Sequence, residues 1–154
     1  MEEFIVKIKR LELDAKIPNY AYEGDAGFDL FAMEPVVLSP GERKMIRTGI
    51  AMEIPHGFVG LIWDKGSVSM KYGLKTLGGV VDSGFRGEIK VGLVNLSGED
   101  YKIEKHDKVA QMIVQEFEHA QIEEAEDLGK SERGEKGFGS SGKNFAEENK
   151  NIEA

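Results

Sequence analysis

Short apolar runs separated by turn-forming residues recur along most of this chain. They lie at residues 4–8, 36–38, 45–50, 58–62, 80–81, 89–94 and 109–114. Most end within a few residues of Gly, Pro, Asn or Asp, and in residues 88–95 apolar side chains occupy one face of an alternating pattern. Runs of this length and spacing predict many short β-strands, and therefore an all-β sandwich or barrel. The 19 glycines also argue against a helical bundle.

Two segments depart from this pattern. The stretch DKGSVSMKYGL, residues 64–74, starts with an Asp and has a short periodic face, so it predicts one short helix. After about residue 115 the chain becomes rich in charge and then polar, with little apolar surface to bury. We therefore expect a β-barrel core over residues 1–120, a mobile C-terminal arm over 121–142 and a disordered tail over 143–154.

Length and charge narrow the classes of protein. A chain of 154 residues that is 40% hydrophobic can bury one core, so we expect one domain. The net charge of −8 argues against nucleic acid or an anionic membrane as a partner, because both need a basic face. The absence of cysteine excludes a disulfide framework and a thiol nucleophile. The N-terminus lacks an apolar signal region and no apolar run approaches about 20 residues, so we expect a soluble cytoplasmic protein.

Two stretches carry candidate chemistry. In GGVVDSGFRGEIKV, residues 78–91, an apolar strand delivers Asp82 to a turn, and the chain returns through Phe85. An Asp at this place is commonly a turn former that bonds its own backbone, and Phe85 could equally belong to the core. In the second stretch, Lys65, Gly66 and Ser67 combine a cation, a flexible backbone and a hydroxyl. These three residues either bind a phosphate group or simply form the start of a helix.

Three further segments are ambiguous when each is taken alone. AGFDLFA contains Asp29, and HDKVAQMIV contains Asp107 and Gln111; both also read as strand edges. RGEKGFGSSG, residues 133–142, holds four glycines, two serines and the single aromatic residue Phe138 in a segment too flexible to be core. The three histidines have no metal-ligand spacing, and no Gly-x-Ser-x-Gly elbow is present, so a histidine metal site and a serine hydrolase are both unsupported.

Taken in order, AGFDLFA, DKGSVSMKYGL, GGVVDSGFRGE, HDKVAQMI and RGEKGFGSSG resemble the five motifs of the trimeric dUTP pyrophosphatase (dUTPase) family. The resemblance covers residues 26–142. It implies a jelly-roll-like fold of the β-clip type, a distorted barrel, assembled as a homotrimer with active sites shared between subunits. It also implies hydrolysis of dUTP to dUMP and pyrophosphate, which limits uracil in DNA and supplies dUMP for thymidylate synthesis.

The resemblance assigns a role to each candidate residue. Asp82 would be the general base that deprotonates the attacking water, and Asp29 would contact Mg²⁺, the expected cofactor, through a water. A hairpin over residues 76–90 would admit uracil, with Phe85 against the sugar. Phe138 would stack on the base as the arm of one subunit closes over a neighbouring site. The substrate-binding set is then Lys65, Gly66, Ser67, Thr76, Gly79, Val80, Val81, Phe85, Lys90, Gln111, Arg133, Phe138, Gly139, Ser140 and Ser141.

Several positions depart from the family pattern. Lys65 stands where Arg is frequent, which removes a bidentate phosphate contact, and Gly66 stands where Ser is usual. Phe85 replaces a common Tyr, whereas His106 and Lys136 replace glycines. Two alternatives stay open: a dCTP deaminase of the same fold, alone or with dUTPase activity, and a non-catalytic nucleotide-binding trimer. The deaminase needs a glutamate where this chain has Gly92, and a pure binding protein has no need of a base at Asp82.

Overall fold

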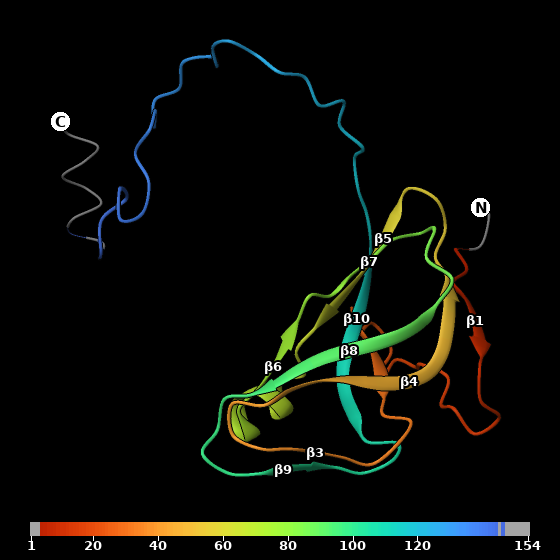
Figure 1. The fold of residues 1–154 in the computed structure, drawn as a ribbon. Helices are drawn as coiled ribbons and strands as arrows, with labels where there is room; N and C mark the ends of the chain where they lie inside the picture. The colour runs from red at the N-terminus through yellow and green to blue at the C-terminus, as the bar shows by residue number, and fades with distance from the viewer. Residues whose placement is uncertain (1–3, 145, 147–154) are drawn as a thin grey trace. The chain divides into compact units, whose positions relative to one another are not determined.

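The structure, a computed structural model, describes residues 4–144 and 146. In that part of the chain ten strands and one short π-helix form (Figure 1). Their bounds are β1 Lys7–Arg10, β2 Phe28–Phe31, β3 Val36–Leu38, β4 Arg43–Glu53, β5 Phe58–Trp63, η1 Ser67–Lys71, β6 Leu74–Leu77, β7 Val80–Val81, β8 Glu88–Asn95, β9 Tyr101–Ile103 and β10 Lys108–Glu116. The prediction of an all-β fold is confirmed.

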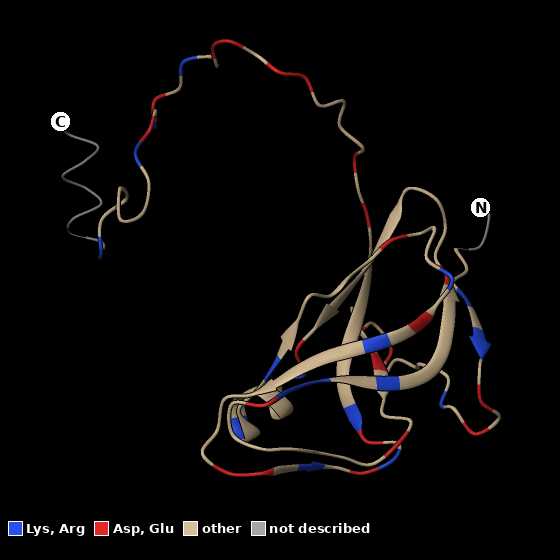
Figure 2. Ribbon diagram, viewed as in Figure 1, with Lys and Arg blue, Asp and Glu red and all other residues tan. Residues whose placement is uncertain are grey.

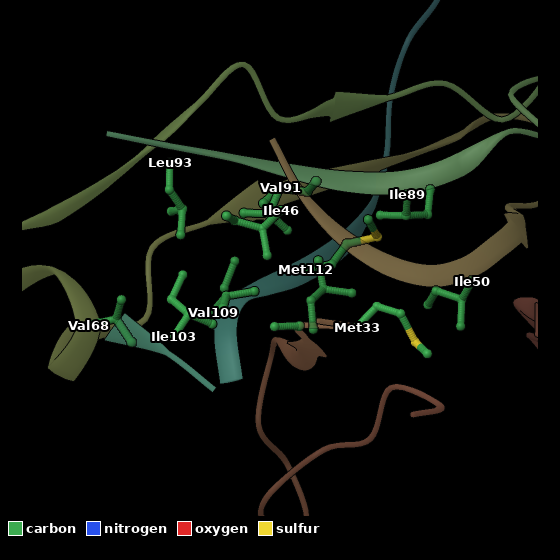
Figure 3. Close-up of a cluster of buried hydrophobic side chains, with 14 of the residues drawn as sticks. Met33, Ile46, Ile50, Val68, Ile89, Val91, Leu93, Ile103, Val109 and Met112 are labelled. Atoms are coloured by element: carbon green, nitrogen blue, oxygen red, sulfur yellow. The ribbon is translucent and has the colours of Figure 1, made fainter. Parts of the chain in front are cut away.

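The strands form two antiparallel sheets and a small two-stranded ribbon. One sheet has the order β1-β4-β8-β6, the other β2-β10-β5-β7, and β3 pairs with β9. Side chains from both larger sheets fill one core, in which Ile46 and Val91 from the first face Met112 from the second (Figure 3). Because alternate residues of β8 point inward, Ile89, Val91 and Leu93 are buried as the sequence pattern predicts.

The structure corrects several details of the sequence interpretation. The apolar residues 4–6 precede β1 and lie outside it, while β2, β6 and β9 form where no long apolar run is present. The helix predicted over residues 64–74 is only the five-residue η1. It stops at Gly73, whose φ of +74° breaks the helical path before β6 begins.

The hairpin predicted over residues 76–90 forms only at its ends, because β7 does not pair with β8. β6 pairs with β8, with Thr76 opposite Leu93, whereas β7 leaves that sheet and pairs with β5 in the other. The turn that carries Asp82 therefore links two sheets instead of two neighbouring strands. A pocket lies beside this turn.

The chain divides into two units, with the boundary after His119. The first contains every strand of the described residues. In the second, the described residues form local turns, in which the Lys136 amide donates to the Arg133 carbonyl and the Gly142 amide donates to the Gly139 carbonyl. Of the tail predicted to be disordered, 143–154, all but residues 143, 144 and 146 lie outside the described part of the chain. None of the helices described is long and apolar enough to cross a membrane.

Candidate active site

A hollow of about 670 Å³ opens beside the turn between β7 and β8. It is lined by Met45, Ile62, Leu77, Gly78, Gly79, Val80, Val81, Asp82, Phe85, Glu88, Ile89 and Lys90. Its size is typical of small-molecule pockets, which combine apolar walls with a few polar groups. Six of the residues predicted from the sequence as site residues, Gly79, Val80, Val81, Asp82, Phe85 and Lys90, share this one pocket.

Gly79 fixes the wall of the pocket. Its carbonyl accepts a hydrogen bond from the Ile62 amide at 2.8 Å, and its φ is +111°. A Cβ atom at this position would lie 2.8 Å from the Ile62 carbonyl oxygen. Only glycine allows β7 to approach β5 so closely, and Val80 and Val81, which follow it, line the pocket.

Asp82 lies at an exposed turn with its carboxylate uncommitted. Its backbone carbonyl accepts a hydrogen bond from the Phe85 amide at 3.1 Å, while Arg86 donates to the Ser83 carbonyl at 2.6 Å. Within residues 4–144 and 146, no hydrogen bond or ion pair to the Asp82 carboxylate is present. The common structural role of a turn Asp, bonding its own backbone, is therefore not what this side chain does.

The Phe85 ring packs against Gly87, two residues further along the chain. A Cβ atom added to Gly87 would come within 2.7 Å of the Phe85 ring, so the ring covers that backbone. Phe85 is 47% exposed and lines the pocket. Phe85 is thus not a core residue, which was the alternative left open by the sequence.

A second polar cluster forms around Asp29. This carboxylate on β2 is only 2% exposed and is ion-paired with Lys65 and with Lys108, whose Nζ lies 2.7 Å from Oδ2. Burial alone raises the pKa of Asp29, but the contacts with Lys108 and Lys65 outweigh it and hold the pKa below its usual value. Sequence reasoning missed Lys108, although it lies within the quoted HDKVAQMIV segment.

Gln111 and Thr76 are held by a shared neighbour, Asp64. The Gln111 amide donates to the Asp64 carbonyl at 2.9 Å, and the Asp64 carboxylate accepts from the Thr76 amide at 2.8 Å. Lys75 lies 2.8 Å from the other Asp64 oxygen. Thr76 lines a smaller hollow of about 200 Å³ together with Gly79 and Val80. Asp64 was not identified from the sequence, because its role depends on strand pairing.

The remaining predicted residues lie at the start of η1 and in the second unit. Gly66, the residue before η1, and Ser67, its first residue, are both exposed. Arg133, Lys136, Ser140 and Ser141 line a hollow of about 510 Å³ within the second unit. Phe138 is fully exposed there and Gly139 has a φ of +79°. Asp107, in contrast, accepts a hydrogen bond from the Glu104 amide at 2.8 Å, which makes it a turn residue.

The acidic residues do not form a preassembled metal centre. Within the described residues no group of three His, Cys, Asp or Glu side chains could hold a metal ion. The Asp29 carboxylate already contacts two lysines. Asp82 is the one aspartate among the described residues that line the pocket beside β7. These residues therefore fit a metal that is held mainly by a ligand's own oxygens better than one held by the chain.

Comparison with known sequences gives a consistent result. A sequence model of the dUTPase family matches residues 14–142 of the chain. A deoxyuridine 5'-triphosphate nucleotidohydrolase of Clostridioides difficile is 45% identical and aligns over 89% of this chain and 97% of its own length. An enzyme of the same name from Nautilia profundicola is 44% identical, with 90% and 99% of the two chains aligned.

Solved structures agree. The dUTPase of Staphylococcus bacteriophage 80alpha with dUpNHpp is 31% identical, with a TM-score of 0.84 over 90% of this chain and 98% of that one. A mutant dUTPase from phage phi11 of S. aureus, described with a structural Mg(II) ion, is 27% identical, with a TM-score of 0.75 over 80% and 98% of the two chains. The sequence match over most of the chain and the shared fold together show that this chain belongs to the dUTPase family.

Proposed function

We propose that this protein hydrolyses dUTP to dUMP and pyrophosphate, and so limits uracil in DNA and supplies dUMP. The observation that carries the proposal is the pocket beside β7, which is lined by both Asp82, whose carboxylate is uncommitted, and the half-exposed Phe85. A carboxylate without a structural partner can accept a proton from water, and an aromatic ring can hold a sugar. The dUTPase homologues and the phage enzyme with the dUTP analogue dUpNHpp support this substrate.

Asp82 acts in this proposal as the general base. It orients a water and accepts its proton while the water attacks the α-phosphorus, and pyrophosphate leaves. The backbone of Gly79, Val80 and Val81 reads the polar edge of uracil. The Phe85 ring occupies the place where a ribose 2'-hydroxyl would project, so UTP would bury an unpaired hydroxyl and bind poorly.

The triphosphate is held by cations and by donors from the other motifs. Lys65, Lys90 and Arg133 supply positive charge, while Ser67, Gln111, Ser140 and Ser141 supply hydrogen-bond donors. Mg²⁺, held by the phosphate oxygens, would neutralise the charge that develops on the leaving pyrophosphate. Asp29 would position Lys65 and Lys108, and any contact with the metal would pass through a water.

We further propose a homotrimer with shared active sites. The pocket beside β7 is lined by neither Lys65, Ser67 nor Gln111 of the same chain. A site that needs both the pocket beside β7 and these phosphate-binding residues is therefore completed by a second copy of the chain, as in the trimers of the dUTPase family. The arm of one subunit, with Phe138 exposed, would close over the base bound to its neighbours.

The deaminase alternative is disfavoured by the position of Gly92. This residue is buried in β8, and a Cβ atom there would lie 3.0 Å from the Leu77 carbonyl oxygen. A glutamate side chain at this position would have to displace the β6 backbone. The binding-only alternative is separated from the enzyme by testing Asp82 directly.

The experiment is pyrophosphate release from dUTP, dCTP, dTTP and UTP with Mg²⁺. We expect turnover of dUTP alone, and Asp82→Asn should lower kcat by about a thousandfold or more with little change in dUTP affinity. The control is Asp107→Asn, a turn aspartate whose amide variant still accepts the Glu104 hydrogen bond. Ammonia release from dCTP would sink the dUTPase proposal. If the parent and Asp82→Asn both bind dUTP without turnover, the binding-only trimer would be favoured.

A further inference from the structure

Arg47 on β4 gathers three glutamates from distant parts of the chain. It is ion-paired with Glu12, which follows β1, its Nη1 lies 3.7 Å from Glu34, which follows β2, and its Nε lies 3.2 Å from Glu88. Hydrogen bonds to Glu12 and Glu88 raise the pKa of the guanidinium further above its already high value. Basic and acidic positions accordingly meet where β4 and β8 lie side by side (Figure 2).

Glu88 is held firmly because β4 carries an irregularity opposite it. The β4–β8 register shifts between Arg47 and Ala51, so intervening residues lose regular ladder partners. The Gly49 amide donates instead to the Glu88 carboxylate at 2.9 Å, and the Thr48 hydroxyl donates to the Ile89 carbonyl. The Glu88 side chain is 14% exposed, although it lies at the edge of the pocket beside β7.

Lys90 is the residue directly opposite Arg47. The two are paired in the β4–β8 register, so both side chains project to the same face of the sheet. Glu88, two residues before Lys90 on the same strand, also projects to that face. Glu88 and Lys90 both line the pocket, yet among the described residues Glu88 is paired with Arg47, and Lys90 has no ion-pair partner.

We propose that Arg47 is a positioning residue for the nucleotide pocket: by holding Glu88 it prevents a Glu88–Lys90 pair and leaves the Lys90 ammonium for the anionic substrate. Without Arg47, the Glu88 carboxylate, two residues from Lys90 on the same strand and face, would draw the ammonium toward itself. It would also place an uncompensated negative charge at a pocket that receives a polyanion. The inference rests on the proposed dUTPase activity.

Two single variants and their combination test it in the full-length protein. Arg47→Met frees Glu88, and we expect KM for dUTP to rise about tenfold with kcat within about twofold of the parent. Glu88→Gln removes the charge while its amide oxygen still accepts from Gly49, so KM should change little. In the double variant Glu88 carries no charge beside Lys90, although Glu12 and Glu34 stay charged, and we expect KM to fall most of the way back toward the parent value.

The double variant separates positioning from simple support of the fold. If Arg47 only stabilised the sheet, removing Glu88 as well would leave KM at least as high as in Arg47→Met, and this result would overturn the proposal. A second check is Lys90→Met, which should raise KM by itself and abolish any further effect of Arg47→Met. Should Arg47→Met fold poorly, Arg47→Gln carries the same expectations, with thermal unfolding measured for each variant.

The control is an ion pair of the same kind on the same sheet. Lys7 and Glu53 pair across β1 and β4 at 2.9 Å, both exposed, and neither lines the pocket. Glu53→Gln should leave KM and kcat unchanged. An inactive parent protein would count against the proposed function itself, whereas an active parent whose KM is insensitive to Arg47→Met would count only against this inference.

Discussion

The two units of the chain hold their functional residues in different ways. In the first unit, candidate residues are fixed by partners far away in the sequence: Lys65 by Asp29, and Gln111 by the Asp64 carbonyl. In the second unit, Arg133 donates to the carbonyl of Lys136, three residues away, and Phe138 is fully exposed. The first unit is therefore preorganised, and we predict that the second becomes ordered only on a ligand or another chain.

The largest expected effect comes from removing the arm. A chain ending at residue 129 should lose about a thousandfold in kcat/KM for dUTP, because the arm supplies Arg133 and Phe138. Its thermal midpoint should stay within about 2 °C of the full chain, since the first unit contains the hydrophobic core. Pyrophosphate release and circular dichroism measure the two quantities.

Two variants refine this test. Phe138→Ala should reproduce part of the loss and Phe138→Trp should restore most of it, because a stacking ring is what the position provides. Full activity in the shortened chain would show that the arm is no part of the site. A large fall in its thermal midpoint would show that the arm supports the core.

The next prediction concerns a variant that should lose stability and keep activity. Leu38→Ala removes a fully buried side chain of β3, so the free energy of unfolding should fall by about 3 kcal/mol. Activity per folded molecule should change little, because Leu38 lines neither the pocket beside β7 nor the Asp29 cluster. The matched control is the adjacent Val37→Ala, which is 44% exposed and should cost less than about 1 kcal/mol. Equal losses would contradict the assignment of the core.

The sequence predicted elements whose signal is local and missed those that depend on distant partners. The alternation over residues 88–95 identifies β8, because period two is a property of the strand itself. In β2 the run Phe28–Phe31 contains a buried aspartate, which contradicts a simple apolar pattern. Only the two lysines brought beside Asp29 by folding explain it. The placement of β7 in the second sheet, away from β6 and β8, likewise depends on which strand it pairs with, and no local sequence pattern predicts that.

The candidate site divides in the same way. Asp82 and Phe85 were candidates because a turn, an acid and an aromatic residue are adjacent in the sequence, and their roles came from the family resemblance. The structure places both at one pocket. Lys108, Asp64 and Arg47 were not identified, because each matters through an ion pair or hydrogen bond between segments. Roles such as base stacking by Phe138 came from the family resemblance and remain predictions.

The smallest expected effect concerns Asp64, the acid that joins β5 to β6 beside Thr76. Burial raises the pKa of its carboxyl, but hydrogen bonds from Lys75 and Thr76 outweigh this and lower the pKa below its usual value. Because the folded-state pKa is depressed, the stabilisation is present at neutral pH and is lost as pH falls below about 4 through that pKa.

Asp64→Asn keeps an acceptor for the Thr76 amide but loses the charge that attracts Lys75. The free energy of unfolding at pH 7 should therefore fall by about 1 kcal/mol, and urea titrations should show the parent and variant converging as the pH drops toward 3. Asp127→Asn, in the exposed second unit, should follow the parent at every pH. A constant gap between parent and Asp64→Asn would mean that the lost hydrogen-bond geometry, and not the carboxylate charge, links β5 to β6.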